Sequence, residues 1–380
     1  MRILHICNDY CGSKVHSSLV RTLDGMGVRQ TVYCPVRTAA KVGGNSFEGQ
    51  DTRFVYSHII KPWHHYTYYT KARTLYRDMT SKVEVGEFDV IHAATLFSDG
   101  ILACRASRQH GVPYVVAVRG TDIEFLHRAP QAWPAGVRVM LGASRIVFIT
   151  PALQKQFCES VVVRTLLPRI EHKFEIVPNG VDDYWLAHLV DGRMPVREWG
   201  GNLDKVIYVG TLIGRKHPVQ LAQAVLALHE EFPGVELHFV GDGGECEKKI
   251  RRLAGQYSNI HFHGRITDKE RLRQLYARCD VFAMPSVGET FGLVYIEALT
   301  QGLPVLYTKN DGVDGIVPPD AGEGVKPQVR GIEDGLRKML GVSRQYTTPG
   351  REWFDQFRWP TIAAHYAEMY DEVRNHRNRR

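Results

Sequence analysis

The sequence DVFAMPSVGETFGLVYIEALTQGLPVLYT, residues 280–308, contains one complete strand–loop–helix–strand unit. An apolar run ends at Pro285, a loop of small residues follows, and a helical pattern begins near Phe291 and Gly292. A second apolar run, 303–308, comes after this helix. Two buried strands joined by a helix predict parallel pairing, because parallel neighbours need a crossover connection. The stretch therefore predicts an α/β fold with helices on both faces of a parallel sheet.

The same alternation continues on both sides of this stretch and divides the chain in two. The segment 184–204 has no sustained period and contains Pro, Gly and Asp, so it is the predicted linker. We expect two Rossmann-like domains, 1–183 and 205–358, that face each other across a central cleft. Residues 359–380 begin with a helical pattern that either caps its own domain or crosses back to complete the first one. The predicted strands lie at 2–7, 89–93, 114–118, 146–149, 174–178, 205–210, 235–241, 259–264, 280–286 and 303–308, and helices of the second domain lie near 217–231, 245–256, 268–278 and 292–301.

A helix that begins at Gly292 offers a binding site for an anion. The first N–H groups of a helix have no partner within it, and a glycine lets a ligand approach the backbone closely. Glu289 precedes this helix and Glu297 lies one to two turns inside it, so the two carboxylates cannot form a close acid/base pair. They suit two hydroxyl-bearing parts of one ligand whose phosphates lie at the helix start. The alternative is an ordinary loop–helix junction with one solvated and one capping Glu.

The pattern P-S-x-x-E-x-F-G-L-x-x-x-E-A-x-x-x-G-x-P-V in this stretch resembles the family-4 retaining glycosyltransferases of GT-B fold, the glycosyl transferases group 1. The resemblance implies transfer of a sugar from a nucleotide sugar, expected to be UDP-linked, to a hydroxyl acceptor without a metal ion. The implied acceptor is a glycan, a lipid-linked glycan or a small glycoside. Other segments that match in order and spacing are PNGVD (178–182), FVGDGG (239–244), FHGRITDKERLRQLYARCDVFAMPS (262–286) and FRWPTIAAHYAEMY (357–370).

The resemblance also assigns the donor site. It implies that Glu289 contacts the hydroxyls of the donor sugar, and that Glu297 contacts the ribose of the nucleotide. Lys216, in VGTLIGRKHP, corresponds to the family lysine that binds the diphosphate. Thr211 stands where the family usually has Arg, so Arg215 is either the second cation of the catalytic group or a solvated cation at a helix start. The other donor-side positions are Gly210, Arg265, Ile266, Thr290 and, through their backbone amides, Phe291, Gly292 and Leu293.

The first domain is expected to bind the acceptor, and it contains four candidate residues. Gly12 lies in NDYCGSK, where many relatives have a glycine pair. Arg119, in VAVRGTDIEF, replaces a family His, so it either binds a phosphate or acidic sugar or forms an ion pair with Asp122 or Asp99. Asp99 either accepts a hydrogen bond from the acceptor hydroxyl or caps a helix. His92 either faces the cleft or is a core histidine.

The basic charge of the chain is concentrated in its first half. The 380 residues carry 48 Lys and Arg against 41 Asp and Glu, a net charge of +7. Residues 1–190 hold 22 basic and 16 acidic residues, a surplus of +6 that favours an anionic or lipid-linked acceptor. In this half, KPWHHYTYYTKARTLYRDMTSK (61–82) mixes aromatic and basic residues. This segment either contacts an anionic membrane surface or packs its tyrosines on the domain.

Further patterns narrow the class of protein. Seven cysteines without a C-x-x-C pair indicate a reducing compartment. No apolar run approaches the ~18 residues needed to span a bilayer, and the start MRILHICND has no signal-peptide pattern. We therefore expect a cytoplasmic protein that lies at the inner face of the membrane if residues 61–82 bind it. No D-x-D or H-E-x-x-H pattern occurs, so neither a metal nor another cofactor is expected. Basic residues form no dense run before the last few positions, so no nucleic-acid partner is expected.

Two other functions remain open at this point. An epimerase or hydrolase acting on a nucleotide sugar would use much the same donor site. A non-catalytic scaffold subunit that binds a nucleotide sugar is the alternative from a different class, motivated by the departures at Thr211 and Arg119.

Overall fold

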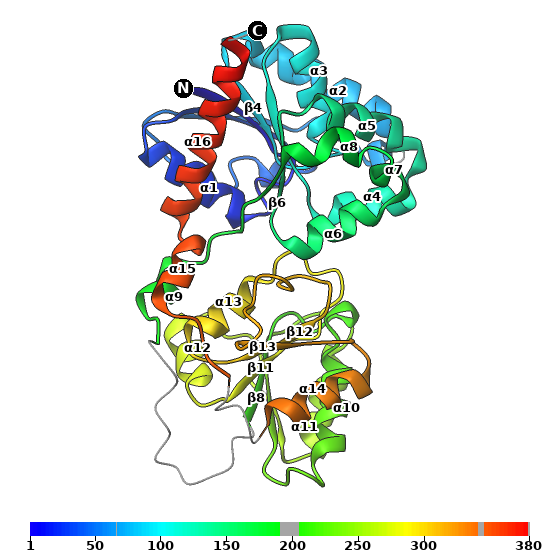
Figure 1. The fold of residues 1–380 in the computed structure, drawn as a ribbon, viewed down its shortest axis with the longest axis vertical. Coiled ribbons are helices and arrows are strands. Elements are labelled where there is room, and N and C mark those ends of the chain that lie inside the picture. Colours follow the sequence, from blue (N-terminus) through cyan, green and yellow to red (C-terminus); the bar gives the residue numbers. More distant parts are fainter. Residues whose placement is uncertain (66, 191–204, 341–345, 379–380) are drawn as a thin grey trace. The chain divides into compact units, whose positions relative to one another are not determined.

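The computed structural model describes residues 1–65, 67–190, 205–340 and 346–378, and it divides into two compact units (Figure 1). Each unit contains one sheet in which every strand pair is parallel. The predicted two-domain α/β architecture is therefore confirmed. Unit 1 comprises Met1–Ile149, Leu153–Gly180 and Trp359–Arg380, and unit 2 comprises Thr150–Ala152 and Val181–Arg358.

The predicted linker 184–204 is only partly described. Its first residues belong to helix α9 (Asp183–Ala187), which packs on the second unit through contacts with helix α13 (Leu293–Thr300). Residues 191–204 lie outside the described residues.

Unit 1 is built on a seven-stranded parallel sheet with the order β3-β2-β1-β4-β5-β6-β7. The chain order reverses between β1 and β4. In open α/β sheets, ligands bind at the carboxyl ends of the strands that flank such a reversal. The strands are β1 (Arg2–Ile6), β2 (Arg29–Pro35), β3 (Thr52–Ser57), β4 (Val90–Ala93), β5 (Tyr114–Ala117), β6 (Arg145–Phe148) and β7 (Phe174–Ile176).

The terminal helix α16 (Trp359–Asn378) belongs to unit 1 and packs beside α1 (Lys14–Gly25) and strand β4 (Figure 1). Apolar side chains of α16, among them Ile362 and Tyr370, lie in one buried cluster with residues of α1 and the sheet. The terminal helix therefore crosses back and completes the first unit. The other helices of unit 1 are α2 (Tyr68–Lys82), α3 (Gly100–His110), α4 (Gly120–Arg128), α5 (Trp133–Gly142), α6 (Pro151–Glu159), α7 (Val161–Arg164) and α8 (Leu167–Ile170).

The two places where the chain passes between the units lie against each other. A Cβ atom at Gly180 would lie 2.5 Å from ring atoms of Trp359, so this close approach requires glycine. The next residue, Val181, donates its N–H to the carbonyl of Phe357 at 2.9 Å. The outgoing segment at Gly180 and Val181 thus packs against the returning segment at Phe357 and Trp359.

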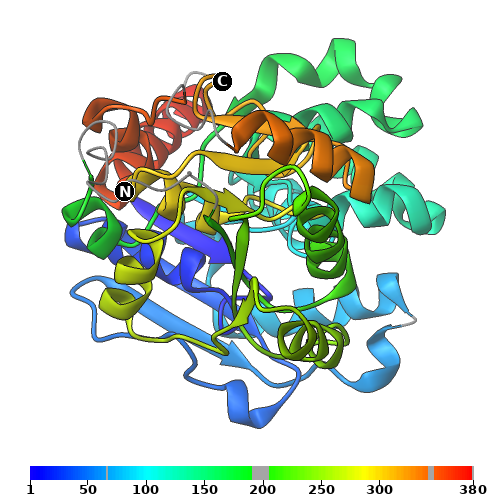
Figure 2. The same ribbon diagram turned by 90° about the horizontal axis from the view of Figure 1, so that it is seen from below.

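Unit 2 is built on a six-stranded parallel sheet with the order β10-β9-β8-β11-β12-β13, and its reversal lies between β8 and β11. Helices lie on both faces of this sheet, with α10 and α14 packed side by side on one of them (Figures 1 and 2). The elements not yet named are β8 (Lys205–Val209), α10 (Pro218–Leu228), β9 (Glu236–Val240), α11 (Glu247–Gln256), β10 (Ile260–Phe262), α12 (Lys269–Tyr276), β11 (Val281–Ala283), β12 (Val305–Thr308), β13 (Gly322–Val325), α14 (Val329–Met339) and α15 (Arg351–Phe354).

Candidate functional site

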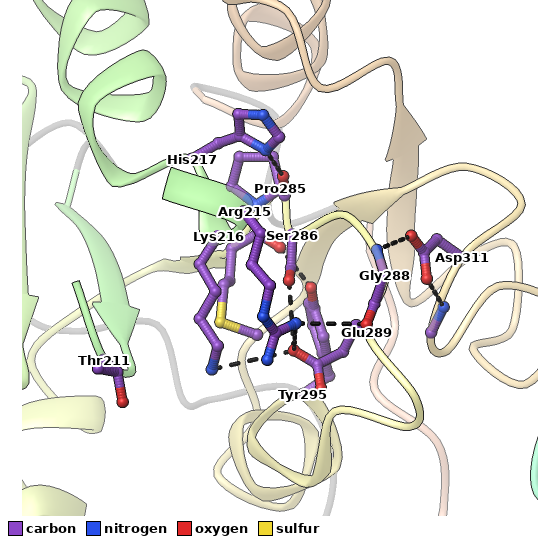
Figure 3. Close-up of polar contacts among 12 residues, drawn as sticks. Thr211, Arg215, Lys216, His217, Pro285, Ser286, Gly288, Glu289, Tyr295 and Asp311 are labelled. Carbon is purple, nitrogen blue, oxygen red and sulfur yellow. Dashed lines mark hydrogen bonds and ion pairs between the residues drawn. The ribbon is translucent and has the colours of Figure 1, made fainter. Parts of the chain in front are cut away.

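The loops that follow β8 and β11 flank the reversal of unit 2, and together they form a charged cluster (Figure 3). The loop after β8 forms a short 3₁₀ turn that carries Arg215 and Lys216. Glu289 lies in the loop after β11. Its Oε2 is 3.9 Å from Lys216 Nζ and 4.0 Å from Arg215 Nη1. The structure thus brings together the three residues that the sequence predicts as the catalytic group.

Lys216 and Glu289 are shielded from water, whereas Arg215 is not. Their side chains are 15% and 16% exposed, against 50% for Arg215. Burial lowers the pKa of Lys216, and the negative charge of Glu289 opposes this effect. A Cβ atom at Gly210 would lie 3.1 Å from Lys216 Nζ, so the glycine lets the ammonium group approach the end of β8. An ammonium with so few water contacts is well suited to bind an anionic ligand.

Several hydrogen bonds hold the two loops in place (Figure 3). The N–H of Val287 donates to the Arg215 carbonyl at 2.7 Å, and the Arg215 guanidinium donates to the Gly288 carbonyl at 3.3 Å. His217 Nδ1 lies 2.9 Å from the Pro285 carbonyl oxygen. These contacts join the backbone of the loop after β8 to that of the loop after β11, so the cations are positioned relative to Glu289.

Gly292 is the N-cap residue of helix α13 and adopts the left-handed conformation with φ of +82°. A Cβ atom here would lie 2.5 Å from the ring of Tyr295, so glycine is required. Phe291 is buried, and the centroid of its ring lies 6.2 Å from that of the Phe357 ring. Thr290 and Leu293 are partly exposed. The start of α13 therefore lies beside the Glu289 loop, as the predicted anion site requires.

Glu297 lies further along α13, apart from the charged cluster. Burial raises its pKa to about 7, helped by the nearby charge of Asp182, while Lys269 and a hydrogen bond from Trp185 oppose the shift. The carboxyl group therefore changes its protonation near neutral pH.

The loops after β9 and β10 adjoin the loop after β8. A Cβ atom at Gly241 would lie 2.0 Å from the Gly210 carbonyl oxygen, and the Gly241 N–H donates to the Gly264 carbonyl at 2.9 Å. Arg265 is exposed and Ile266 partly exposed in the segment that follows. These donor-side residues therefore lie at the same edge of the sheet as Gly210.

In unit 1, Asp99 fixes the loop that follows β1. Its Oδ1 accepts the N–H of Asn8 at 3.2 Å, and its Oδ2 accepts the hydroxyl of Thr95 at 2.9 Å. It occupies the N-cap position of α3 without a side-chain capping bond. Burial raises the pKa of Asp99 to about 7. In the loop that follows β1, a Cβ atom at Gly12 would lie 2.5 Å from Asp9 Oδ1. These loops flank the reversal of the first sheet.

Asp122 holds the start of α4 and the loop after β4 together. Its carboxylate accepts the N–H groups of Leu96, Phe97 and Arg119 at 3.1, 3.0 and 2.9 Å. The contact between Asp122 and Arg119 therefore runs through the main chain of Arg119. The Arg119 side chain donates from Nε to the Ala94 carbonyl at 3.3 Å and is partly exposed.

His92 lies in the core of unit 1 and not at its surface. Its side chain is 3% exposed, and its Nδ1 lies 2.7 Å from the hydroxyl of Tyr370 in α16. Its ring also stacks on that of Tyr366, with 5.3 Å between the ring centroids. The assignment of His92 to the acceptor side is therefore corrected, because the returning terminal helix covers this residue.

The basic-aromatic segment 61–82 includes helix α2 and divides into buried and exposed parts. Tyr68 donates to the Phe97 carbonyl at 2.8 Å, and Tyr76 is buried. Trp63 and Tyr69 are 47% and 49% exposed. None of the described helices has the length and apolar character that a membrane span requires.

Sequence reasoning assigned no role to two further residues that support the site, Asp311 outside the recognised pattern and Ser286 within it. Asp311 follows β12 and accepts the Gly288 N–H at 2.6 Å. Ser286 donates its hydroxyl to Glu289 Oε2 at 3.3 Å. The only signal for Asp311 was an Asp-Gly pair, which marks a turn and does not indicate a loop contact.

Two parallel-sheet units, with a charged cluster at the sheet reversal of the second, define the class of GT-B proteins. Two family models match the chain, Glycosyltransferase Family 4 over residues 14–184 and Glycosyl transferases group 1 over residues 194–345. The chain belongs to the family-4 glycosyltransferases of GT-B fold. It is therefore a glycosyltransferase, and membership implies a nucleotide-sugar donor and a hydroxyl acceptor.

Three similar proteins illustrate the relationship. A GDP-mannose-dependent alpha-(1-6)-phosphatidylinositol monomannoside mannosyltransferase of Mycolicibacterium smegmatis is 28% identical, over 75% of this chain and 77% of that protein. The sulfoquinovosyl transferase SQD2 of Arabidopsis thaliana is 36% identical, but over only 34% of this chain and 24% of that protein. The structure of Anabaena HepE in complex with UDP and glucose has a TM-score of 0.65 at 17% identity, and the match covers 98% of this chain and 99% of that one.

Proposed function

We propose that this chain is a retaining glycosyltransferase that takes its sugar from a UDP-linked donor and does so without a catalytic metal ion. One observation carries the proposal: Lys216 Nζ and Arg215 Nη1 lie within 4.0 Å of the Glu289 carboxylate at the sheet reversal of unit 2. Two cations beside a carboxylate that can accept hydrogen bonds from sugar hydroxyls support a nucleoside diphosphate sugar as the ligand.

In this proposal the cations bind the diphosphate. The leaving nucleoside diphosphate gains negative charge in the transition state, and Lys216, Arg215 and the amides of residues 291–293 stabilise that charge. These groups perform the charge neutralisation for which other transferases use a divalent cation. Glu289 accepts hydrogen bonds from the donor sugar, and Glu297 accepts them from the ribose. We expect transfer to continue in EDTA, and strict dependence on added Mg²⁺ or Mn²⁺ would refute this part of the proposal.

Retention is proposed to arise from front-face displacement. The leaving phosphate takes the proton of the acceptor hydroxyl, and no side chain of the protein acts as the nucleophile. The anomeric configuration of the product is the direct test. Proton NMR of the product formed from an α-linked donor should show an α-linked sugar, and a β-linked product would refute retention.

The proposed nucleobase of the donor is uracil. The backbone near Gly264 and Ile266 is the expected contact. HepE binds UDP in its structure, whereas the mannosyltransferase relative is named for GDP-mannose. Thermal unfolding with UDP, GDP and ADP decides among them, because a ligand at a hundred times its Kd stabilises the folded state by about 2.7 kcal/mol. We expect the largest shift with UDP, and a larger shift with GDP would overturn this choice.

The acceptor is proposed to be the hydroxyl of a glycan, a lipid-linked glycan or a small glycoside, anionic or carried by a membrane lipid. The surplus of +6 in residues 1–190 and the exposed Trp63 and Tyr69 support such an acceptor. We accordingly propose a cytoplasmic protein that binds the inner membrane face peripherally. Cosedimentation with vesicles that contain anionic lipid tests this, with neutral vesicles as the control. Equal binding to both would refute an electrostatic membrane contact.

Activity assays separate transfer from the alternative functions. An epimerase or hydrolase converts the nucleotide sugar when no acceptor is present, whereas a transferase consumes it only with an acceptor pool. A scaffold subunit turns over no donor, and E289A then leaves the phenotype unchanged. Radiolabelled donor with and without a glycolipid extract therefore distinguishes the three functions.

A further inference from the structure

Two neighbouring strands of unit 2 bring a glutamate and two histidines to one face of the sheet. Strands β9 and β10 pair in parallel, and His238 lies opposite His261 in their register. Glu236 precedes His238 by two residues in β9, and side chains two apart in a strand point to the same face. The three side chains therefore meet at the β10 edge of the sheet.

The donor atoms of these side chains converge. Glu236 Oε2 lies 3.2 Å from His238 Nε2 and 3.5 Å from His261 Nε2, and all three donor atoms lie within 4.8 Å of one another. A tetrahedral zinc site with ligand distances of about 2.0–2.1 Å places neighbouring ligand atoms about 3.3 Å apart. The spacing already present is thus close to the spacing that a bound ion would require.

A fourth residue orients the central histidine. His238 Nδ1 lies 3.0 Å from His263 Nε2. If His238 donates its proton there, its Nε2 presents a lone pair toward the Glu236 carboxylate, and a cation between the two resolves that repulsion. Metal-bound histidines generally use the other ring nitrogen in an outer hydrogen bond of this kind.

We propose that Glu236, His238 and His261 form a binding site for a divalent transition-metal ion of the Zn²⁺ class, with water as the fourth ligand. Two imidazoles and one carboxylate form a donor set that suits zinc. The site lies on strands β9 and β10, whereas the catalytic group lies on the loops after β8 and β11. The bound ion links the edge strand β10 to β9 and has no part in sugar transfer.

Lys205 pairs with Glu236 and opposes the ion. Its Nζ lies 3.5 Å from Glu236 Oε2, opposite Glu236 in the register of β8 and β9. A positive charge there competes with the metal for the carboxylate. Its side chain is 43% exposed and can turn toward water when the ion binds.

The test is titration of Zn²⁺ into the full chain, prepared without a histidine tag and treated with a chelator. We expect one ion per chain and an increase in Tm. H261A removes a ligand whose side chain is 38% exposed, so this variant should fold and bind far more weakly. H263A, which removes the outer partner, should weaken binding by about 10–100-fold. H229A, at the exposed end of α10, is the control and should bind as the wild type does.

Two further measurements make the proposal falsifiable. K205M should bind Zn²⁺ more tightly than the wild type, a gain that a misfolded variant would not show. Co²⁺ should give the visible absorption of a tetrahedral complex in the wild type and lose it in H261A. The proposal is overturned if the stoichiometry is below one ion per chain, or if H261A and H229A bind Zn²⁺ alike.

Discussion

The N–H of Gly288 donates to Oδ2 of Asp311 at 2.6 Å, and this bond ties the loop that carries Glu289 to the segment after β12. Oδ1 of Asp311 accepts the N–H of Gly312 at 2.8 Å, so one carboxylate fixes two backbone groups. A Cβ atom at Gly312 would lie 3.3 Å from Glu289 Cβ, which shows how closely this segment supports the glutamate. Asp311 therefore holds the Glu289 loop in place, and we expect it to be a positioning residue for the proposed donor site.

We predict that D311A lowers kcat/KM for the donor by about 10–100-fold, because a displaced catalytic group loses its alignment. It should also cost about 1–3 kcal/mol of stability, since the N–H groups of Gly288 and the buried Gly312 lose their acceptor. D311N keeps one acceptor oxygen and should fall between D311A and the wild type in both measurements. D334A alters an exposed aspartate of α14 and should change neither. Equal kinetics for D311A and the wild type would contradict a positioning role.

We predict that K216M lowers kcat by about 10²–10³-fold, the usual loss when a group that stabilises the leaving charge is removed. R215M should lose less, because the Arg215 side chain is 50% exposed and its charge is screened by water. Steady-state kinetics with a saturating acceptor measure both, and K248M, an exposed lysine of α11, is the control. A larger loss in R215M than in K216M would reverse the assigned order of the two cations.

We predict that donor binding strengthens as pH rises through about 7, because the carboxylate form of Glu297 accepts the ribose hydroxyls. Burial raises the pKa of Glu297 from 4.5 to about 7. The folded state thus holds the proton more tightly than the unfolded chain, and the wild type should lose about 1–3 kcal/mol of stability as pH rises from about 4.5 to 7. The Kd of a nucleotide sugar and the Tm, measured from pH 5 to 8, check both trends. E297Q should lose the pH dependence of donor binding and show a smaller change in Tm, because buried Asp99, whose pKa is also raised to about 7, still contributes to the Tm trend. An identical pH dependence of donor binding in E297Q would assign it to another group.

The relative placement of the predicted donor-side residues could be read from the sequence, because these residues are close along the chain. Glu289, Gly292 and Glu297 lie within one strand–loop–helix unit, so their spacing determines their placement. Asp311 could not be predicted in the same way, since its contact with Gly288 depends on how the segment after β12 returns to the sheet. The strand β13 was missed because its sequence, GEGV, has two glycines and no apolar alternation.

The acceptor side was predicted less well, because its contacts join distant segments. The sequence around His92 does not indicate whether the residue is buried. Its burial depends on helix α16, which lies far along the chain and covers it. Asp99 was expected either to bind the acceptor hydroxyl or to cap α3; it occupies the N-cap position of α3, and its oxygens bind Asn8 and Thr95. Strands β2 (Arg29–Pro35) and β3 (Thr52–Ser57) carry polar residues along much of their length and were not in the predicted set.

We predict that D122A destabilises the protein by about 1–3 kcal/mol, because the carboxylate of Asp122 is the acceptor for three main-chain N–H groups. Two of the three N–H groups belong to the buried Leu96 and Phe97. Urea unfolding measures the loss. E124A, at an exposed position of the same helix, should stay within about 0.5 kcal/mol of the wild type. If D122A and E124A unfold at the same urea concentration, the carboxylate does not support the loop after β4.

We predict that Y370F destabilises the protein without changing its kinetics, because Tyr370 pairs with His92 inside unit 1. The hydroxyl lies 2.7 Å from His92 Nδ1, and both side chains are buried. Removal of the hydroxyl leaves a buried ring nitrogen without its partner, at a cost of about 1–3 kcal/mol. Y257F, which alters a tyrosine that is 43% exposed, should cost less than about 0.5 kcal/mol. A core role for His92 predicts an unchanged KM for the acceptor in Y370F below its unfolding temperature, whereas a raised KM with unchanged stability would return His92 to the acceptor site.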